Sequence, residues 1–288
     1  MVQVQTTPTG GSAVAEAFER LERAGLETPR ADAEFLVGHV LGLTRSELYL
    51  ERSRLLTDAE RRTLDELLER RAGREPLAYV LGEWGFRRLT LKTDPRALIP
   101  RPETEIVVER ALQHIRDLPE PLVLDVGTGT GAIALAIADE HPAARVTAID
   151  ASTDALALAA DNLARTGING RVRLVEHDLM EGFGSHVFDL VVSNPPYVEP
   201  DDLPTLAPEV REWEPRIALV AHGATAAVAR AATEGLKQDG WLVLEVGEQQ
   251  GGRVASLLEE LGYSEIRVMP DLAGRDRVVE GRWTCRGR

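Results

Sequence analysis

Short apolar runs alternate with helical segments between Pro121 and Ser193, and this alternation constrains the fold more than any other feature. The apolar runs cover residues 122–126, 145–150, 172–176 and 187–192, and the helical segments between them cover 132–138 and 153–165. Such alternation predicts parallel strands joined by right-handed helical crossovers. We therefore expect the α/β class, with a doubly wound, mostly parallel sheet.

A glycine-rich segment follows the first predicted strand directly. It reads Gly127-Thr128-Gly129-Thr130-Gly131 and runs into the helix that begins at Ala132. Glycines allow a tight turn and a close approach of backbone to ligand, and a helix start offers free N–H groups. The spacing is not that of the dinucleotide-binding G-x-G-x-x-G motif, and a glycine-rich turn alone is weakly specific. All five residues are candidate cofactor ligands.

Acidic residues end the next two predicted strands. Asp150 lies about twenty residues beyond the glycines, the spacing at which related folds place a carboxylate on ribose hydroxyls. Asp178 follows the third strand and could accept from an exocyclic amine, while Leu179 could pack on a purine. The alternatives are a helix N-cap for Asp150 and a plain loop position for Asp178. Together with the glycines, these residues predict a nucleoside site.

The fourth strand ends in Asn194-Pro195-Pro196-Tyr197. Two prolines cannot continue a central strand, so the motif lies at the carboxyl edge where open α/β sheets bind ligands. The Asn194 side-chain carbonyl and the Pro195 backbone carbonyl could accept both N–H bonds of a planar nitrogen, and Tyr197 could pack on that flat group. The alternative is a simple strand-ending turn. We expect the four residues to bind the substrate, with Asn194, Pro195 and Tyr197 catalytic and Asn194 also facing the cofactor.

Composition excludes several classes of protein. The chain has 288 residues, a formal charge of −14 and one cysteine, Cys285. The acidic balance argues against a surface built for nucleic acid. A single cysteine excludes a disulfide or a cysteine metal cage within the chain, and the histidines show no metal-ligand spacing. No secretory leader or apolar run of membrane-spanning length is present, so we expect a cytoplasmic protein without metal or membrane contact.

The segments before the sheet divide the chain into further parts. Residues 1–11 lack periodicity and predict a disordered tail. Residues 12–83 predict a small helical bundle, in which Ser12 can cap the first helix and Thr44 with Glu47 and Thr57 with Glu60 form capping boxes. Residues 84–105 predict a hairpin and linker, followed by a catalytic domain over 106–288. Pro100 and Pro102 hold Arg101 extended, so Arg101 and Glu103 are candidate substrate-binding residues.

Nearly the whole chain resembles the bacterial release-factor glutamine methyltransferases. The resemblance rests on the glycine segment, on Asn194–Tyr197, and on residues 74–79, 98–105, 214–216 and 271–277. It implies a helical substrate-recognition domain over residues 12–83 and a class I methyltransferase domain that uses S-adenosylmethionine, with S-adenosylhomocysteine as product. It also implies methylation of the glutamine in the Gly-Gly-Gln motif of peptide chain release factors. One departure is the segment 222–227, where similar proteins usually have a glycine-rich, acidic segment.

Three alternatives stay open at this point. The Asn-Pro-Pro-Tyr motif suits an adenine or cytosine amine in nucleic acid as well as an amide, although the acidic balance argues against nucleic acid as substrate. A glutamine of a ribosomal protein is a second possible target. A non-catalytic donor-binding protein is a third. We expect a monomer whose protein substrate is a release factor.

Overall fold

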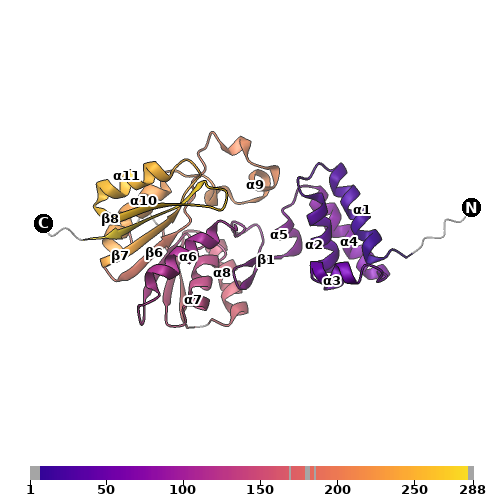
Figure 1. Ribbon diagram of the computed structural model, residues 1–288, viewed down its shortest axis with the longest axis horizontal. Helices are drawn as coiled ribbons and strands as arrows, with labels where there is room; N and C mark the ends of the chain where they lie inside the picture. Colours follow the sequence, from indigo (N-terminus) through magenta and orange to yellow (C-terminus); the bar gives the residue numbers. More distant parts are fainter. Residues whose placement is uncertain (1–6, 169, 179–181, 185, 285–288) are drawn as a thin grey trace, which may run out of the picture. The chain divides into compact units, whose positions relative to one another are not determined.

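The computed structural model describes residues 7–168, 170–178, 182–184 and 186–284. Its contacts separate the chain into two units (Figure 1). The first unit combines Met1–Gly82 with Ala207–Trp213, and the second combines Glu83–Leu206 with Glu214–Arg288. Among the described residues, no helix is both long and apolar enough to cross a membrane.

The second unit is built on a seven-stranded sheet in the order β5-β4-β3-β6-β7-β9-β8. The strands are β3 (Leu122–Val126), β4 (Arg145–Asp150), β5 (Val172–Glu176), β6 (Phe188–Ser193), β7 (Leu236–Glu245), β8 (Tyr263–Pro270) and β9 (Asp276–Trp283). The first five run parallel, and β9 pairs antiparallel with both β7 and β8. The predicted α/β fold with a mostly parallel sheet is confirmed.

Helices cover both faces of this sheet (Figure 1). α6 (Thr104–Ile115) and α7 (Ala132–Glu140) bury their apolar side chains in one core cluster. α10 (Ala224–Gly235) and α11 (Gly251–Leu261) supply the cluster on the opposite face. α8 (Thr153–Thr166) packs near the first of these clusters and near the hairpin formed by β1 (Glu83–Phe86) and β2 (Leu89–Lys92). Two apolar faces explain why the central strands are almost wholly apolar.

The first unit is helical. It contains α1 (Gly10–Arg23), α2 (Pro29–Leu41), α3 (Arg45–Leu50), α4 (Asp58–Ala72), α5 (Leu77–Leu81) and α9 (Pro208–Trp213). The predicted capping boxes of Thr44 with Glu47 and of Thr57 with Glu60 are present at α3 and α4. Each satisfies two backbone N–H groups at a helix start, which explains the sharp boundaries.

The structure corrects the predicted tail. Thr9, not Ser12, caps α1, and Ser12 completes a capping box with it. The Gly10 and Gly11 amides donate to the carbonyl oxygens of Arg54 and Arg52, at 2.8 and 2.7 Å. These tertiary bonds order residues 7–11, which a sequence without periodicity could not indicate. Residues 1–6 lie outside the described part.

The helical unit also takes up a short segment from far along the chain. Glu209 of α9 accepts from Arg71 at 3.1 Å and from Arg74 at 3.0 Å. Arg71 is buried and donates its Nε to Asp32 of α2 at 2.7 Å. The predicted catalytic domain over 106–288 is therefore interrupted, because α9 groups with the helices.

We expect Asp32→Ala to destabilise the helical unit by about 1.5–3 kcal/mol, because the buried Arg71 Nε loses its carboxylate partner while Glu209 still pairs with the guanidinium. Hydrogen exchange of α2 and α4 peptides measures the loss. The matched control is Asp65→Ala, which removes a 3.9 Å pair with Arg20 whose carboxylate is 62% exposed. That control should change stability by less than about 1 kcal/mol. Equal exchange in both variants would contradict the buried-pair account.

Candidate active site

A cavity of about 340 Å³ opens at the carboxyl edge of the parallel strands, within the second unit. Val126 of β3 pairs in register with Ser193 of β6, and the Ser193 hydroxyl donates to the Val126 carbonyl at 2.7 Å. The residues that follow them, Gly127 and Asn194, both line the cavity. Strand pairing thus brings the glycine segment and the Asn-Pro-Pro-Tyr motif together.

The glycine segment forms the tight turn that was predicted. Gly127, Gly129 and Gly131 have φ values of +73°, +57° and +83°, which a residue with a side chain rarely adopts. A Cβ at Gly127 would meet nothing within 4 Å, so the turn leaves open space beside its backbone. This geometry fits a ligand that must approach the main chain closely.

Asp125 supports the turn from behind. Its fully buried carboxylate accepts from the Thr128 hydroxyl at 2.6 Å and from the Ala134 amide at 3.2 Å through one oxygen, Oδ2. The other oxygen, Oδ1, has no hydrogen-bond partner among the described residues. Burial raises the pKa of Asp125 to about 7, against the lowering effect of those two hydrogen bonds.

Asp150 lies at the end of β4, where it lines the cavity. Its Oδ2 accepts from the Gly129 amide at 2.9 Å, and its Oδ1 accepts from the Ser152 amide at 2.9 Å. A carboxylate offers about four acceptor positions, so Asp150 can hold the turn and still accept from hydroxyl groups. Burial raises the pKa of Asp150, although backbone hydrogen bonds oppose the shift.

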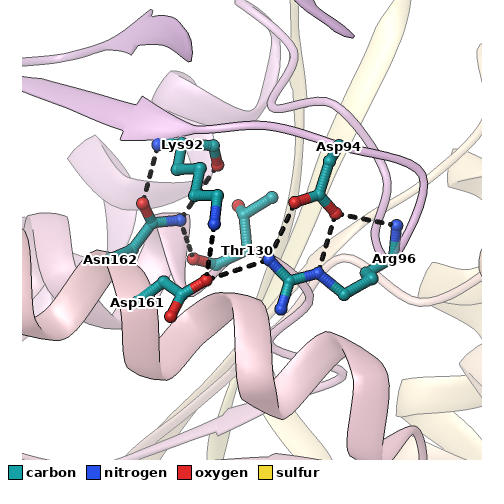
Figure 2. A network of polar contacts seen from close by, with 6 residues as sticks. All are labelled: Lys92, Asp94, Arg96, Thr130, Asp161 and Asn162. Atoms are coloured by element: carbon teal, nitrogen blue, oxygen red, sulfur yellow. Dashed lines mark hydrogen bonds and ion pairs between the residues drawn. The ribbon is translucent and has the colours of Figure 1, made fainter. Parts of the chain in front are cut away.

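A polar network braces the glycine turn against the hairpin (Figure 2). The buried Asn162 of α8 accepts from the Lys92 amide at 2.7 Å and donates to the Thr130 and Lys92 carbonyls at 2.9 and 3.1 Å. Next to it, Arg96 donates to Asp94 and to Asp161. The segment after β2 therefore reaches the cavity with a fixed backbone.

Asn194 belongs to a chain of four polar side chains. Its Nδ2 donates to the Thr104 hydroxyl at 3.2 Å, and that hydroxyl donates to Glu245 Oε2 at 2.7 Å. The Tyr197 hydroxyl donates to Glu245 Oε1 at 3.3 Å. Burial raises the pKa of Glu245 to about 7, while Thr104, Arg277 and Tyr197 lower it and Glu103 adds to the rise.

The remaining wall of the cavity is held by Glu214. Its buried carboxylate accepts from the Ile99 amide at 3.1 Å and from the Arg101 guanidinium. Ile99, Arg101 and Pro215 line the cavity. Arg101 is thus positioned by an acid from the Glu214-Pro215-Arg216 segment, which the sequence alone could not pair with it.

The structure brings most of the predicted site residues to this cavity. Lining residues that were predicted are Gly127, Thr128, Gly129, Thr130, Asp150, Asn194, Pro196 and Arg101. Gly131, Asp178, Pro195, Tyr197 and Glu103 are not among the lining residues, and Leu179 lies outside the described residues. Gly131 is the left-handed N-cap of α7, Glu103 is the N-cap of α6, and Asp178 is exposed. The roles proposed for these residues stay predictions.

Sequence reasoning missed several residues of the site. His177, Thr104 and the 95–100 segment line the cavity. Thr104 also contacts Asn194, and Glu245 contacts Tyr197 from behind the lining. The sequence does offer one signal for Glu245, because an acidic residue at the end of an apolar strand is unusual. Glu245 is the last residue of β7, and Asp125 is the second-last residue of β3. Within the described part of the chain, no group of three His, Cys, Asp or Glu residues is placed to hold a metal ion.

Comparison with known proteins identifies the family. Residues 12–82 match the PrmC N-terminal domain family, and residues 105–213 match the methyltransferase small domain family. The release factor glutamine methyltransferase of Deinococcus radiodurans is 44% identical over 93% of this chain and 96% of its own length. The chain belongs to the release factor glutamine methyltransferase family. The family member of Caulobacter vibrioides is 40% identical over 92% of this chain and 93% of its own length.

A solved structure supports the class I methyltransferase fold. The S-adenosylmethionine-dependent O-methyltransferase of Thermotoga maritima superimposes with a TM-score of 0.50 at 17% identity, over 67% of this chain and 68% of its own. At that identity the likeness concerns the fold alone. The resemblance inferred from sequence motifs is thereby confirmed at the level of family and fold.

The buried Asp125 predicts a pH-dependent stability for this family member. Its folded pKa of about 7 exceeds the ordinary value of 3.8, so between these values the unfolded chain binds fewer protons and stability falls as pH rises. Asp125→Asn stays neutral and can still accept from Thr128. From pH 5 to pH 8 the wild type should therefore lose on the order of 2–3 kcal/mol more than the variant. Urea unfolding followed by tryptophan fluorescence measures this, and parallel pH curves would contradict it.

Proposed function

We propose that this protein transfers a methyl group from S-adenosylmethionine to the side-chain amide nitrogen of the glutamine in the Gly-Gly-Gln motif of peptide chain release factors. One observation carries the proposal. The register of Val126 with Ser193 puts a glycine turn and an Asn-Pro-Pro-Tyr motif on one cavity, so a methyl donor and a planar nitrogen can meet there. The names of the family's curated members support this choice of substrate.

The residues of the cavity fit a nucleoside with a charged tail. The glycine turn, with positive φ at Gly127 and Gly129, admits a ligand against its backbone, and Asp150 keeps acceptor capacity for ribose hydroxyls. When bound there, S-adenosylmethionine supplies an electrophilic methyl group and leaves as S-adenosylhomocysteine. Apolar lining from Ile133 and Ile149 suits the flat faces of the nucleoside.

The acceptor nitrogen is a poor nucleophile, because the lone pair of an amide is delocalised. Asn194 Nδ2 is taken by Thr104, so its Oδ1 is left to accept from the substrate. With the Pro195 carbonyl, it can hold both N–H bonds and stabilise positive charge that builds on the nitrogen. Alignment of nitrogen and methyl then supplies much of the remaining acceleration. The proton lost from the nitrogen can pass to water.

We expect Asn194→Ala to lower methyl transfer by about 100-fold or more, the loss typical for one preorganised electrostatic contact. Donor affinity should change less than about threefold, since Asp150 and the glycine turn remain. The assay mixes the protein with labelled S-adenosylmethionine and purified release factor, and mass spectrometry locates the methyl group. Full transfer by the variant would refute the assigned role. Label on a ribosomal protein or on DNA, but not on the release factor, would refute the substrate.

Asp150→Ala should weaken donor binding by about 10- to 100-fold, because a buried hydrogen bond to a charged acceptor is lost. Calorimetry with S-adenosylhomocysteine measures the change. The matched control is Asp117→Ala, which alters a carboxylate that is 94% exposed and does not line the cavity. Its affinity should match that of the wild type. Equal losses in the two variants would contradict the role assigned to Asp150.

A further inference from the structure

We propose that Thr104 and Glu245 are positioning residues that fix which side of the Asn194 amide faces the acceptor nitrogen. The inference rests on the proposed function of Asn194. It concerns a different question, namely why the side-chain carbonyl rather than the NH2 group of Asn194 is presented to the substrate.

The number of hydroxyl protons limits how the hydrogen-bonded side chains from Asn194 to Tyr197 can be arranged. A threonine hydroxyl has one proton to donate and two lone pairs to accept with. In the structure that proton goes to Glu245 Oε2 at 2.7 Å, so toward Asn194 the Thr104 oxygen can only accept. Asn194 must therefore turn its Nδ2 toward Thr104, at 3.2 Å, and its Oδ1 the other way. The opposite orientation would set a carbonyl against a lone pair.

Glu245 can impose this direction because it is an acceptor for both of its neighbours. Its second oxygen accepts from the Tyr197 hydroxyl at 3.3 Å. Tyr197 stays protonated and able to donate, because burial and the nearby Glu245 raise its pKa. Glu245 is fully buried at the end of β7, and Thr104 is buried at the start of α6. Buried partners cannot exchange these bonds for water, so the chain is rigid.

The direction of the hydrogen bonds between Glu245, Thr104 and Asn194 depends on the ionisation of Glu245. Its charged neighbours are Arg277 from β9 and Glu103 before α6, and Tyr197 is its titratable neighbour after β6. A protonated Glu245 could donate to Thr104, whose own proton would then point to Asn194 and favour the reversed amide. Protonation of Glu245 should therefore impair transfer, and activity should rise with pH around 7, the pKa to which burial raises this carboxyl.

The first experiment observes Asn194 without any substrate. The sequence holds three asparagines, Asn162, Asn169 and Asn194, so 15N-asparagine labelling gives three side-chain amide pairs. The Asn194→Ala variant assigns the relevant pair. We expect its amide protons to exchange slowly with water and to shift with pH around 7 in the wild type. In Thr104→Val the protection should be lost, while Thr104→Ser should restore it.

The matched control is Ser193→Ala. It removes a neighbouring buried hydroxyl that donates to the Val126 carbonyl and takes no part in the chain. The Asn194 amide should keep its protection and its pH response in this variant. An Asn194 amide that is unchanged in Thr104→Val, or equally exposed in Ser193→Ala, would overturn the proposal whatever the substrate of the enzyme.

The second experiment measures the consequence for methyl transfer. Thr104→Val should lower kcat about 10- to 100-fold with S-adenosylhomocysteine affinity unchanged within about twofold, and Thr104→Ser should recover most of the rate. Glu245→Gln has no proton to gain, so the acid limb of the wild-type pH profile near 7 should disappear. Wild-type kcat in Thr104→Val, or an acid limb that persists in Glu245→Gln, would refute the positioning role. A wild-type protein that leaves release factor unmethylated would refute only the proposed substrate.

Discussion

The parallel pairing of β3 with β6 is the constraint on which the site depends. Side chains alternate between the faces of a sheet, so a shift of one residue would reverse every one of them. The two faces bury different side chains in separate core clusters, so such a shift would exchange residues of different size between two packed cores. The backbone ladder itself pairs Val126 with Ser193, and the Ser193 hydroxyl donates to the Val126 carbonyl across this pair. Gly127 and Asn194 therefore meet as a consequence of core packing, before any ligand is present.

Two carboxylates close to the pair of β3 and β6 are fully buried. Asp125 supports the glycine turn and Glu245 lies under the Asn194 motif, and burial raises the pKa of both to about 7. Ionisation of these buried carboxylates lowers the stability of the folded protein above neutral pH. Their retention provides a polar environment that is already organised around the site. Glu280, also buried on β9, differs because Arg110 and His114 donate to it and hold its pKa at about 2 despite burial.

Local patterns in the sequence were sufficient for the sheet, the glycine turn and the helix caps. The alternation of apolar runs located β3 to β6 to within a residue, and Thr44 and Thr57 marked true helix starts. The features that the sequence did not predict depend on contacts between distant segments. The bond from Gly10 to Arg54, the pair of Arg101 with Glu214, and the approach of Glu245 to Thr104 leave no local pattern. The α10 helix was not predicted, because its buried stripe consists mostly of alanines, which give a weak periodic signal.

The assignment of α9 to the helical unit has a consequence for protein engineering. The chain passes between the units at Gly82, again before Ala207 and a third time after Trp213, so the helical unit is not a removable N-terminal module. Deleting residues 1–82 would leave Glu209 without Arg71 and Arg74. Chimeras that exchange substrate-recognition helices between family members must therefore carry residues 207–213 along with the N-terminal segment. The junction then falls next to Glu214, whose contacts with Ile99 and Arg101 should remain those of the recipient.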